Sequence, residues 1–100
     1  KQPLVERVRQ RQDRTSVFAQ YTVMHDERDR VIAALGAAGI PTAVHYPAPI
    51  NGQPAYAQFD AGHATPVADA LSKRVFSLPM SADLSDEDQQ RIVEVLSGAL

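Results

Sequence analysis

The residues best suited to chemistry stand together near the middle of the chain. His45 and Tyr46 place an imidazole and a phenol side by side, and the stretch from 47 to 56 that follows contains three prolines. Prolines stiffen a loop, and functional groups on a loop held by a rigid scaffold are a common site design. Residue types alone nevertheless favour a plainer interpretation, in which both rings only pack and hydrogen-bond at the edge of the fold.

Other patterns typical of catalysis or metal binding are missing from the sequence. His25, His45 and His63 are separated by 20 and 18 residues, whereas two ligands on one helix face need a spacing of four. The chain has no cysteine, which excludes disulfides, Cys-ligated zinc and thiol nucleophiles. It also lacks a Gly-rich phosphate loop and a Gly-x-Ser-x-Gly elbow. Lys73 follows an expected helix, a position that favours a solvated side chain over a Schiff-base lysine. We therefore predict no metal, catalytic or cofactor-binding residue in these 100 residues.

Composition indicates one globular domain outside the membrane. The chain has 100 residues, of which 44% are hydrophobic and 22% charged, as in ordinary globular proteins. No apolar run is long enough to cross a bilayer, and the first residues do not form a signal peptide, so we expect a cytoplasmic protein. The net charge is −2. Four arginines between residues 7 and 14 have no aromatic among them, which disfavours nucleic-acid binding.

The periodicity predicts an alternation of strands and helices. Residues 1–15 are polar and predict a linker or cut end, so that the domain spans 16–100. Strands are expected at 16–24, 42–45 and 75–79. The expected helices start at Asp26, Thr65 and Ser85, where a capping residue precedes the apolar positions. Gly39 ends the first helix in a left-handed conformation. Three strands with interleaved helices predict an α/β two-layer sandwich.

The region from 46 to 62 predicts an ordered loop with turns. Its prolines and Asn51-Gly52 rule out a long helix or a central strand. Tyr46, Tyr56 and Phe59 favour packing of this loop over disorder. The two helices that follow have apolar faces at helical spacing. These faces are Val67, Ala70 and Leu71 in the second helix, and Ile92, Val93, Leu96 and Ala99 in the third.

An ordered set of motifs resembles a known family. Residues 39–47 read Gly-Ile-Pro-Thr-Ala-Val-His-Tyr-Pro, and residues 53–56 read Gln-Pro-Ala-Tyr. The flanking motifs are Phe-Ala-Gln-Tyr-Thr-Val at 18–23, Val-Phe-Ser-Leu-Pro-Met at 75–80 and Leu-Ser-Asp-Glu-Asp-Gln at 84–89. In order and spacing, over about residues 16–97, they resemble the C-terminal domain of the DegT/DnrJ/EryC1/StrS aminotransferases.

The resemblance implies a fragment of an enzyme that depends on pyridoxal phosphate. It implies the small C-terminal domain of a fold-type-I aminotransferase: a mostly antiparallel three-stranded sheet with about three helices packed on it. The large domain, with the cofactor and its lysine, would lie outside this chain, so the fragment alone is not expected to be active. The intact enzyme would be a cytoplasmic homodimer. It would move an amino group from L-glutamate to a nucleotide-linked keto-sugar, in amino-sugar or cell-surface polysaccharide biosynthesis.

The resemblance also assigns expected roles to single residues. His45 and Tyr46 match the family's His-Tyr-Pro segment and are expected to bind substrate, while Gln53 and Tyr56 either reach the substrate or only brace the loop. Many members carry a histidine where this chain has Asn51, and a His-Pro pair in place of residues 81–82. The Asn51 version resembles members that aminate C3 of a UDP-linked uronic acid.

An alternative from a different class stays open at this point. A free-standing α/β binding or oligomerisation module could share the architecture without catalysis, because fold alone does not determine function. Such a module would fold and bind a partner as 100 residues, and His45 and Tyr46 would be dispensable. As an isolated fragment, by contrast, the chain is expected to self-associate, because apolar surface that should meet the large domain would be exposed.

Overall fold

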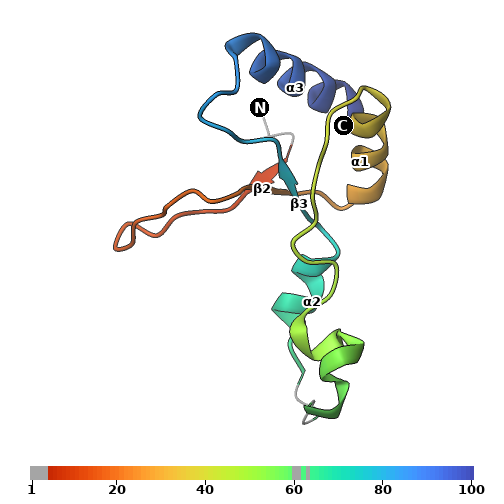
Figure 1. Cartoon of the computed structure of the whole chain (residues 1–100). Helices are drawn as coiled ribbons and strands as arrows, with labels where there is room; N and C mark the ends of the chain where they lie inside the picture. Colours follow the sequence, from red (N-terminus) through yellow and green to blue (C-terminus); the bar gives the residue numbers. More distant parts are fainter. Residues whose placement is uncertain (1–4, 60–61, 63) are drawn as a thin grey trace.

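The computed structural model describes residues 5–59, 62 and 64–100. Its elements, in chain order, are β1 (Glu6–Arg7), β2 (Tyr21–Met24), α1 (Arg28–Ala37), the 3-10 helices η1 (Ile50–Gly52) and η2 (Pro54–Phe59), α2 (Pro66–Ser72), β3 (Val75–Leu78) and α3 (Asp86–Ala99). Figure 1 shows a body formed by the sheet, α1 and α3, from which two extensions project. The three helices agree with the three that the sequence predicts.

The sheet has three antiparallel strands in the order β1-β2-β3. Val23 of β2 lies opposite Phe76 of β3, and Glu6 of β1 lies opposite Met24. A three-stranded antiparallel sheet is what the resemblance implies, but one strand differs from the sequence prediction. Residues 42–45 form only an isolated bridge, Ala43 with Ser77, because the prolines at 41 and 47 interrupt backbone pairing on both sides. The third strand is β1, which lies within the segment expected to be a linker.

The strand expected at 16–24 is shorter than its β-branched and aromatic residues suggest. It begins only at Tyr21. Phe18 has a φ angle of 51°, in the left-handed region that an extended strand cannot contain. The Ser16 hydroxyl accepts a hydrogen bond from the Phe18 backbone nitrogen at 3.0 Å, as in a local turn. The segment from 8 to 20 therefore leaves the body as an arm (Figure 1).

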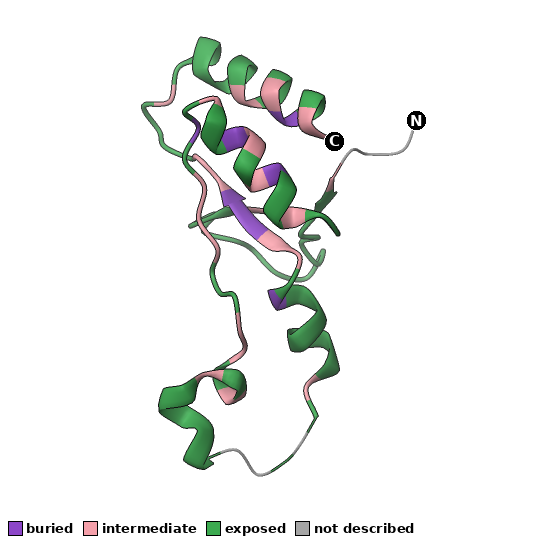
Figure 2. Ribbon diagram, turned by 90° about the vertical axis from the view of Figure 1, so that its right-hand side faces the viewer, coloured by how far each residue is buried: buried purple, intermediate pink, exposed green. Residues whose placement is uncertain are grey.

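The core lies where α1 meets the sheet and α3. It is formed by six buried apolar side chains: Val23, Val31, Leu35, Ile40, Phe76 and Leu96. Figure 2 shows that the buried positions gather on the facing sides of α1, β3 and α3. Helix α1 supplies Val31 and Leu35, both completely buried, at the spacing of four that puts side chains on one helix face.

The ends of α1 and α3 test the capping predictions. Gly39 has a φ of 77°, and the Ile40 nitrogen donates to the Leu35 carbonyl at 2.9 Å, which confirms the left-handed end of α1. The Ser85 hydroxyl accepts from the Asp88 backbone nitrogen at 3.1 Å, which confirms the cap of α3. The prediction for Asp26 was wrong. Glu27 precedes α1 without a side-chain cap, because the Asp26 carboxylate accepts from Arg74 Nε at 2.6 Å instead.

The molecule is more extended than a compact domain. Its radius of gyration is 15.6 Å, against about 13 Å for a compact chain of this length. Besides the arm, the described residues of 46–72, with η1, η2 and α2, form a second extension that we call the lobe (Figure 1). Figure 2 shows the lobe exposed over most of its length. Among the described residues, no helix is long and apolar enough to cross a membrane.

Candidate functional site

The paired rings stand where the chain leaves the body for the lobe. Ala43 exchanges two backbone hydrogen bonds with Ser77, of 3.2 and 2.7 Å, and these bonds tie the chain to β3 two residues before His45. The rings of His45 and Tyr46 then meet edge to face, with centroids 5.3 Å apart and planes at 69°. The peptide bond between them is cis. Both side chains are exposed, Tyr46 by 66%, so both are accessible to a ligand.

The loop behind the rings is held by short local bonds. The Gln53 side-chain amide donates to the Ala48 carbonyl at 3.4 Å, and the Tyr56 backbone nitrogen donates to the Gln53 carbonyl at 3.0 Å. Gln53 is half-buried, whereas the Tyr56 side chain remains 47% exposed. The Gln53 side chain thus bonds within the loop, and the Tyr56 side chain lies at its surface. Contact of either residue with substrate remains a prediction.

The apolar residues of the lobe do not pack as the sequence suggested. Tyr46, Phe59 and Val67 are 66%, 73% and 71% exposed, and Leu71 is 38% exposed. The predicted faces of the loop and of α2 are therefore not core faces within the described residues. The lobe points away from the sheet (Figure 1), so these side chains lie outside the core of the body.

Arg28 at the start of α1 joins the lobe to the body, and sequence reasoning missed this role. Its guanidinium donates to the Ser72 carbonyl at 2.5 Å and to the Val75 carbonyl at 3.4 Å, while its side chain is only 12% exposed. Ser72 ends α2, so the cation meets the negative end of the helix dipole. Residues 28 and 72 are far apart in sequence, and no local pattern signals the pair.

Arg74 makes a second connection at the same place. It bonds Asp26 at 2.6 Å and Glu6 at 3.1 Å, which links β1 to the turn before α1. Burial acts to lower the pKa of Arg74, but the hydrogen bonds to Glu6 and Asp26 outweigh it and raise that pKa above its ordinary value. Charged side chains on three segments, Glu6, Asp26 and Arg74, thus bind one another just beyond the end of the lobe.

Sequence reasoning also missed a side-chain contact within the lobe. The Asn51 amide donates to the Thr65 hydroxyl at 3.1 Å, and that hydroxyl lies 3.3 Å from a carboxylate oxygen of Asp69. Thr65 occupies the N-cap position of α2, as predicted, but its side chain makes no capping bond. The spacing of four between Thr65 and Asp69 was the one available signal.

The described residues do not by themselves fit a bound metal or pyridoxal phosphate. They contain no group of three metal-ligating side chains. Lys73 is exposed at the end of α2, so it is not a lysine enclosed in a cofactor pocket. Lys1, the other lysine of the chain, and His63 lie outside the described residues.

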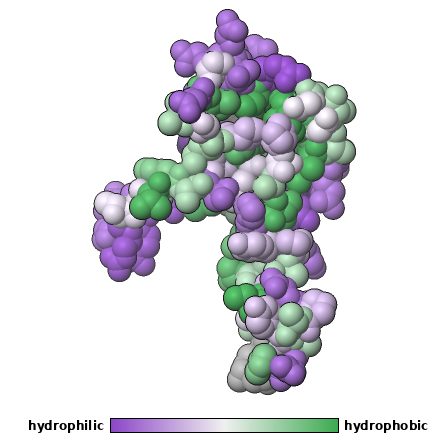
Figure 3. All heavy atoms as spheres, in the orientation of Figure 1, coloured by the Kyte–Doolittle hydropathy of each residue, from purple (hydrophilic) through white to green (hydrophobic). Residues whose placement is uncertain are grey.

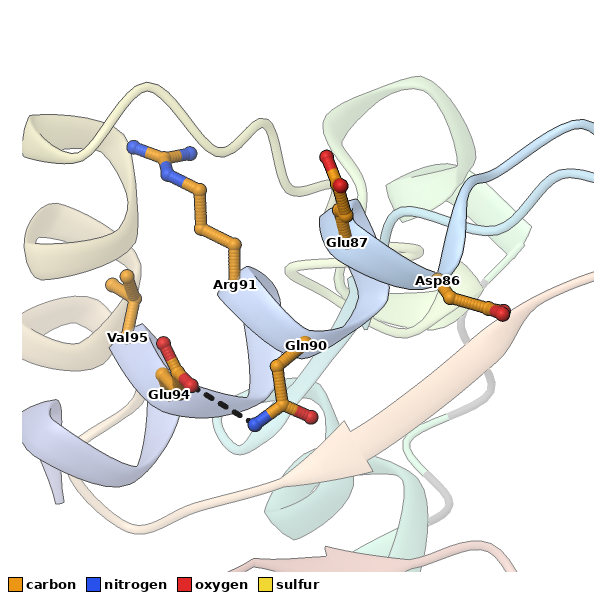
Figure 4. A pocket seen from close by; sticks show the side chains of 6 residues that line it. All are labelled: Asp86, Glu87, Gln90, Arg91, Glu94 and Val95. Atoms are coloured by element: carbon orange, nitrogen blue, oxygen red, sulfur yellow. Dashed lines mark hydrogen bonds between the residues drawn. The ribbon is translucent and has the colours of Figure 1, made fainter.

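A shallow hollow is lined by residues of α3, the helix at the other end of the molecule from the lobe (Figure 1). Figure 4 shows the side chains that line it: Asp86, Glu87, Gln90, Arg91, Glu94 and Val95. All come from one helix, and the Gln90 side-chain amide donates a hydrogen bond to the Glu94 carboxylate at 2.9 Å. Arg91 donates to the Ala38 carbonyl beyond the end of α1. These bonds attach α3 to itself and to α1, and the hollow contains none of the predicted site residues.

Comparison with known proteins finds relatives that include sugar-nucleotide aminotransferases. A protein from Pseudomonas aeruginosa named UDP-2-acetamido-2-deoxy-3-oxo-D-glucuronate aminotransferase is 57% identical over 65 residues, which are 65% of this chain and 18% of that protein. A UDP-N-acetyl-3-dehydro-alpha-D-glucosamine 3-aminotransferase from Acidithiobacillus ferrooxidans is 42% identical over 84 residues, covering 84% of this chain and 22% of the relative. The chain thus spans about a fifth of these relatives.

Solved structures and a family model extend the match over nearly the whole chain. The crystal structure of a DegT DnrJ EryC1 StrS aminotransferase from Brucella abortus superposes with a TM-score of 0.85 at 35% identity, covering 95% of this chain and 26% of that one. The model of the DegT/DnrJ/EryC1/StrS aminotransferase family matches residues 2–97. The chain also has the antiparallel sheet and the His-Tyr-Pro segment at 45–47, and it belongs to the DegT/DnrJ/EryC1/StrS aminotransferase family.

Proposed function

We propose that these residues are the C-terminal domain of a longer, pyridoxal-phosphate-dependent aminotransferase acting on a nucleotide-linked keto-sugar. The observation that carries the proposal is the exposed edge-to-face pair of His45 and Tyr46, set at the junction of a body that folds around its own core and a lobe that does not. Such a pair is suited to form one wall of a site. The two relatives described above, of which this chain covers 18% and 22%, are named as sugar-nucleotide aminotransferases.

His45 and Tyr46 are the groups that we assign to substrate binding. An imidazole offers one donor and one acceptor when neutral, and a phenol offers a donor and an acceptor on one oxygen. Sugar hydroxyls and a uronic carboxylate match such groups. Gln53 would hold the loop, and Tyr56 would approach the substrate from η2.

The sugar is proposed from the relative with the highest identity among those described above. The Pseudomonas aeruginosa protein is named for a UDP-linked 3-oxo-glucuronate, and this chain carries Asn51 where many family members have histidine. We assign amination at C3 of a UDP-linked uronic acid, with L-glutamate as the amino donor. A homodimer in the cytoplasm belongs to the same proposal.

The cofactor would bind outside these 100 residues. When bound, pyridoxal phosphate supplies the electron sink for amino-group transfer, and the protein supplies orientation. Because Lys73 is exposed at the end of α2, we place the cofactor lysine in the remainder of the enzyme. The part played by this chain is to bind and orient the sugar.

The test uses the longer protein that contains this chain. It is purified with pyridoxal phosphate, its visible absorption band is recorded, and L-glutamate is added. Loss of the band with formation of 2-oxoglutarate, followed by recovery of the band on addition of UDP-2-acetamido-2-deoxy-3-oxo-D-glucuronate, is expected. A protein that binds no pyridoxal phosphate would overturn the enzyme proposal and favour a binding module. Recovery with other keto-sugars but not with this one would overturn only the assigned substrate.

A further inference from the structure

A chain of three polar side chains crosses the lobe from η1 to α2. The Asn51 amide nitrogen lies 3.1 Å from the Thr65 hydroxyl, and that hydroxyl lies 3.3 Å from the nearer carboxylate oxygen of Asp69. Asn51 and Thr65 are both half-buried. The contact joins two residues that are 14 apart in sequence, one before η2 and one after it.

The direction of these bonds follows from the number of protons available. The Thr65 hydroxyl carries one proton, and it has two acceptors within reach, Asp69 at 3.3 Å and the Asn51 carbonyl oxygen at 3.4 Å. If Asn51 donates its amide proton to the hydroxyl, the hydroxyl proton is free for the carboxylate. Both bonds are then made at once, and the one to the ionised acceptor is the stronger kind. The consistent polarity therefore runs from Asn51 through Thr65 to Asp69.

The position of Thr65 makes this arrangement unusual. A threonine at an N-cap ordinarily accepts a hydrogen bond from a backbone nitrogen of the first helical turn. Thr65 precedes α2 at that position, yet its side chain makes no capping bond. Its hydroxyl is instead committed to side chains, so the helix start gives up a local stabilising bond and the loop is held against α2.

Short bonds turn the segment held by Asn51 into one unit. The Gly52 nitrogen donates to the Pro49 carbonyl at 2.9 Å, and the Gln53 nitrogen donates to the Ile50 carbonyl at 3.1 Å. The Gln53 side chain reaches back to Ala48 at 3.4 Å. Because this unit begins two residues after Tyr46, an anchor at Asn51 also fixes the direction in which the chain leaves the paired rings and enters the lobe.

We propose that Asn51 is a positioning residue that acts through the Thr65 hydroxyl. It holds the segment from His45 to Gln53 against α2 in the orientation that the sugar nucleotide requires. This inference rests on the proposed function, since it assigns the segment to substrate binding. The inference gives Asn51 and Thr65 a role in which they touch no substrate and act only through the geometry of the loop.

The test compares Thr65→Val with Thr65→Ser in the longer protein. Valine keeps the shape of threonine and removes the hydroxyl, while serine restores it. Hydrogen–deuterium exchange of peptides from 46–59 reports on the anchor, and steady-state kinetics with UDP-2-acetamido-2-deoxy-3-oxo-D-glucuronate reports on its use. We expect faster exchange in Thr65→Val and a KM for the sugar nucleotide raised about tenfold, with kcat and the glutamate half-reaction unchanged. Thr65→Ser should restore wild-type values.

Two further variants complete the design. Thr15→Val makes the same chemical change in the exposed arm and should alter neither readout. Asn51→Ala removes the same bond from its other end, and it replaces Thr65→Val if that variant fails to fold. Unchanged exchange in both lobe variants would overturn the anchor, and faster exchange with an unchanged KM would overturn its role in positioning. A wild-type protein without transamination would overturn the proposed function, and the exchange data would then decide the anchor by themselves.

Discussion

The body and the lobe contain similar apolar residues but use them differently. In the body, Val31 and Leu35 are completely buried, whereas in the lobe Val67 is 71% exposed and Phe59 is 73% exposed. Figure 3 shows hydrophobic patches on the surface of the lobe, while the tip of the arm is hydrophilic. Burial of apolar surface is the main favourable term in folding. The body therefore holds itself together, and the lobe depends on polar anchors at Arg28 and Thr65 or on surfaces outside this chain.

The largest expected effect separates the two regions by stability. Leu35→Ala leaves a cavity in the packed core and should lower the free energy of unfolding by about 2–5 kcal/mol. Val67→Ala in α2 removes an exposed side chain and should change it by about 0.5 kcal/mol or less. Urea denaturation followed by circular dichroism measures both. Equal losses would show that the lobe is packed as tightly as the body.

The next effect concerns the joint between the regions. Arg28→Met should cost about 1–3 kcal/mol, since it leaves the Ser72 and Val75 carbonyls without their charged donor. The matched control is Arg30→Met, because Arg30 also donates to a distant carbonyl, that of Ala99 at 2.6 Å, from a side chain that is 51% exposed. Its loss should stay below about 1 kcal/mol. An Arg28 variant as stable as the control would contradict the role of this joint.

The site itself gives the third prediction. His45→Ala in the longer protein should lower kcat/KM for the sugar nucleotide about tenfold, the equivalent of one hydrogen bond to substrate. Folding should be unaffected, because His45 is exposed. His25→Ala makes the same change in the body and should leave kcat/KM near the wild-type value. Unchanged kinetics in His45→Ala would remove this residue from the site.

The exposed apolar residues of the lobe give the fourth prediction. The isolated 100-residue chain should self-associate as its concentration rises, because exposed apolar patches promote contact between copies. The double change Phe59→Ser and Val67→Ser should shift sedimentation velocity profiles toward the monomer. A wild-type chain that sediments as a clean monomer at every concentration would show that the lobe does not drive association.

The smallest effect is a dependence on pH at the start of α1. The hydrogen bond and the charge of Arg30 lower the pKa of Glu27 below its ordinary value. A lowered carboxyl pKa contributes stability that is fully present above the unfolded-state pKa and is lost as the pH falls through the folded-state pKa. Glu27→Gln should therefore reduce stability slightly at neutral pH, and the difference from wild type should vanish in acid. Denaturation midpoints between neutral and strongly acidic pH measure it, and a difference that grows in acid would contradict this sign.

Local signals explain which features could be predicted from the sequence. The left-handed Gly39 and the Ser85 cap depend on neighbours within a few residues, and both predictions are confirmed. The cap at Asp26 was wrong because a distant residue, Arg74, binds that carboxylate. The strand at 16–24 was too long because the φ of Phe18 is not encoded by its β propensity. For the site, the sequence predicted His45 and Tyr46 as a pair, but not the anchors that hold their loop.

The sequence by itself determined the three helices, the C-terminal end of α1, the start of α3, and the ordered motifs from 39 to 56 by which the family is identified. These depend on spacing along one segment, which the chain carries wherever it folds. Only the tertiary structure decided that Glu6–Arg7 complete the sheet, that Arg28 meets the end of α2, and that the Thr65 hydroxyl binds Asn51 instead of a backbone nitrogen of α2. Each of these contacts joins polar groups on segments that are separate in the sequence, so the choice of partner is not a local one. That choice depends on which partner the folded chain brings within hydrogen-bonding distance.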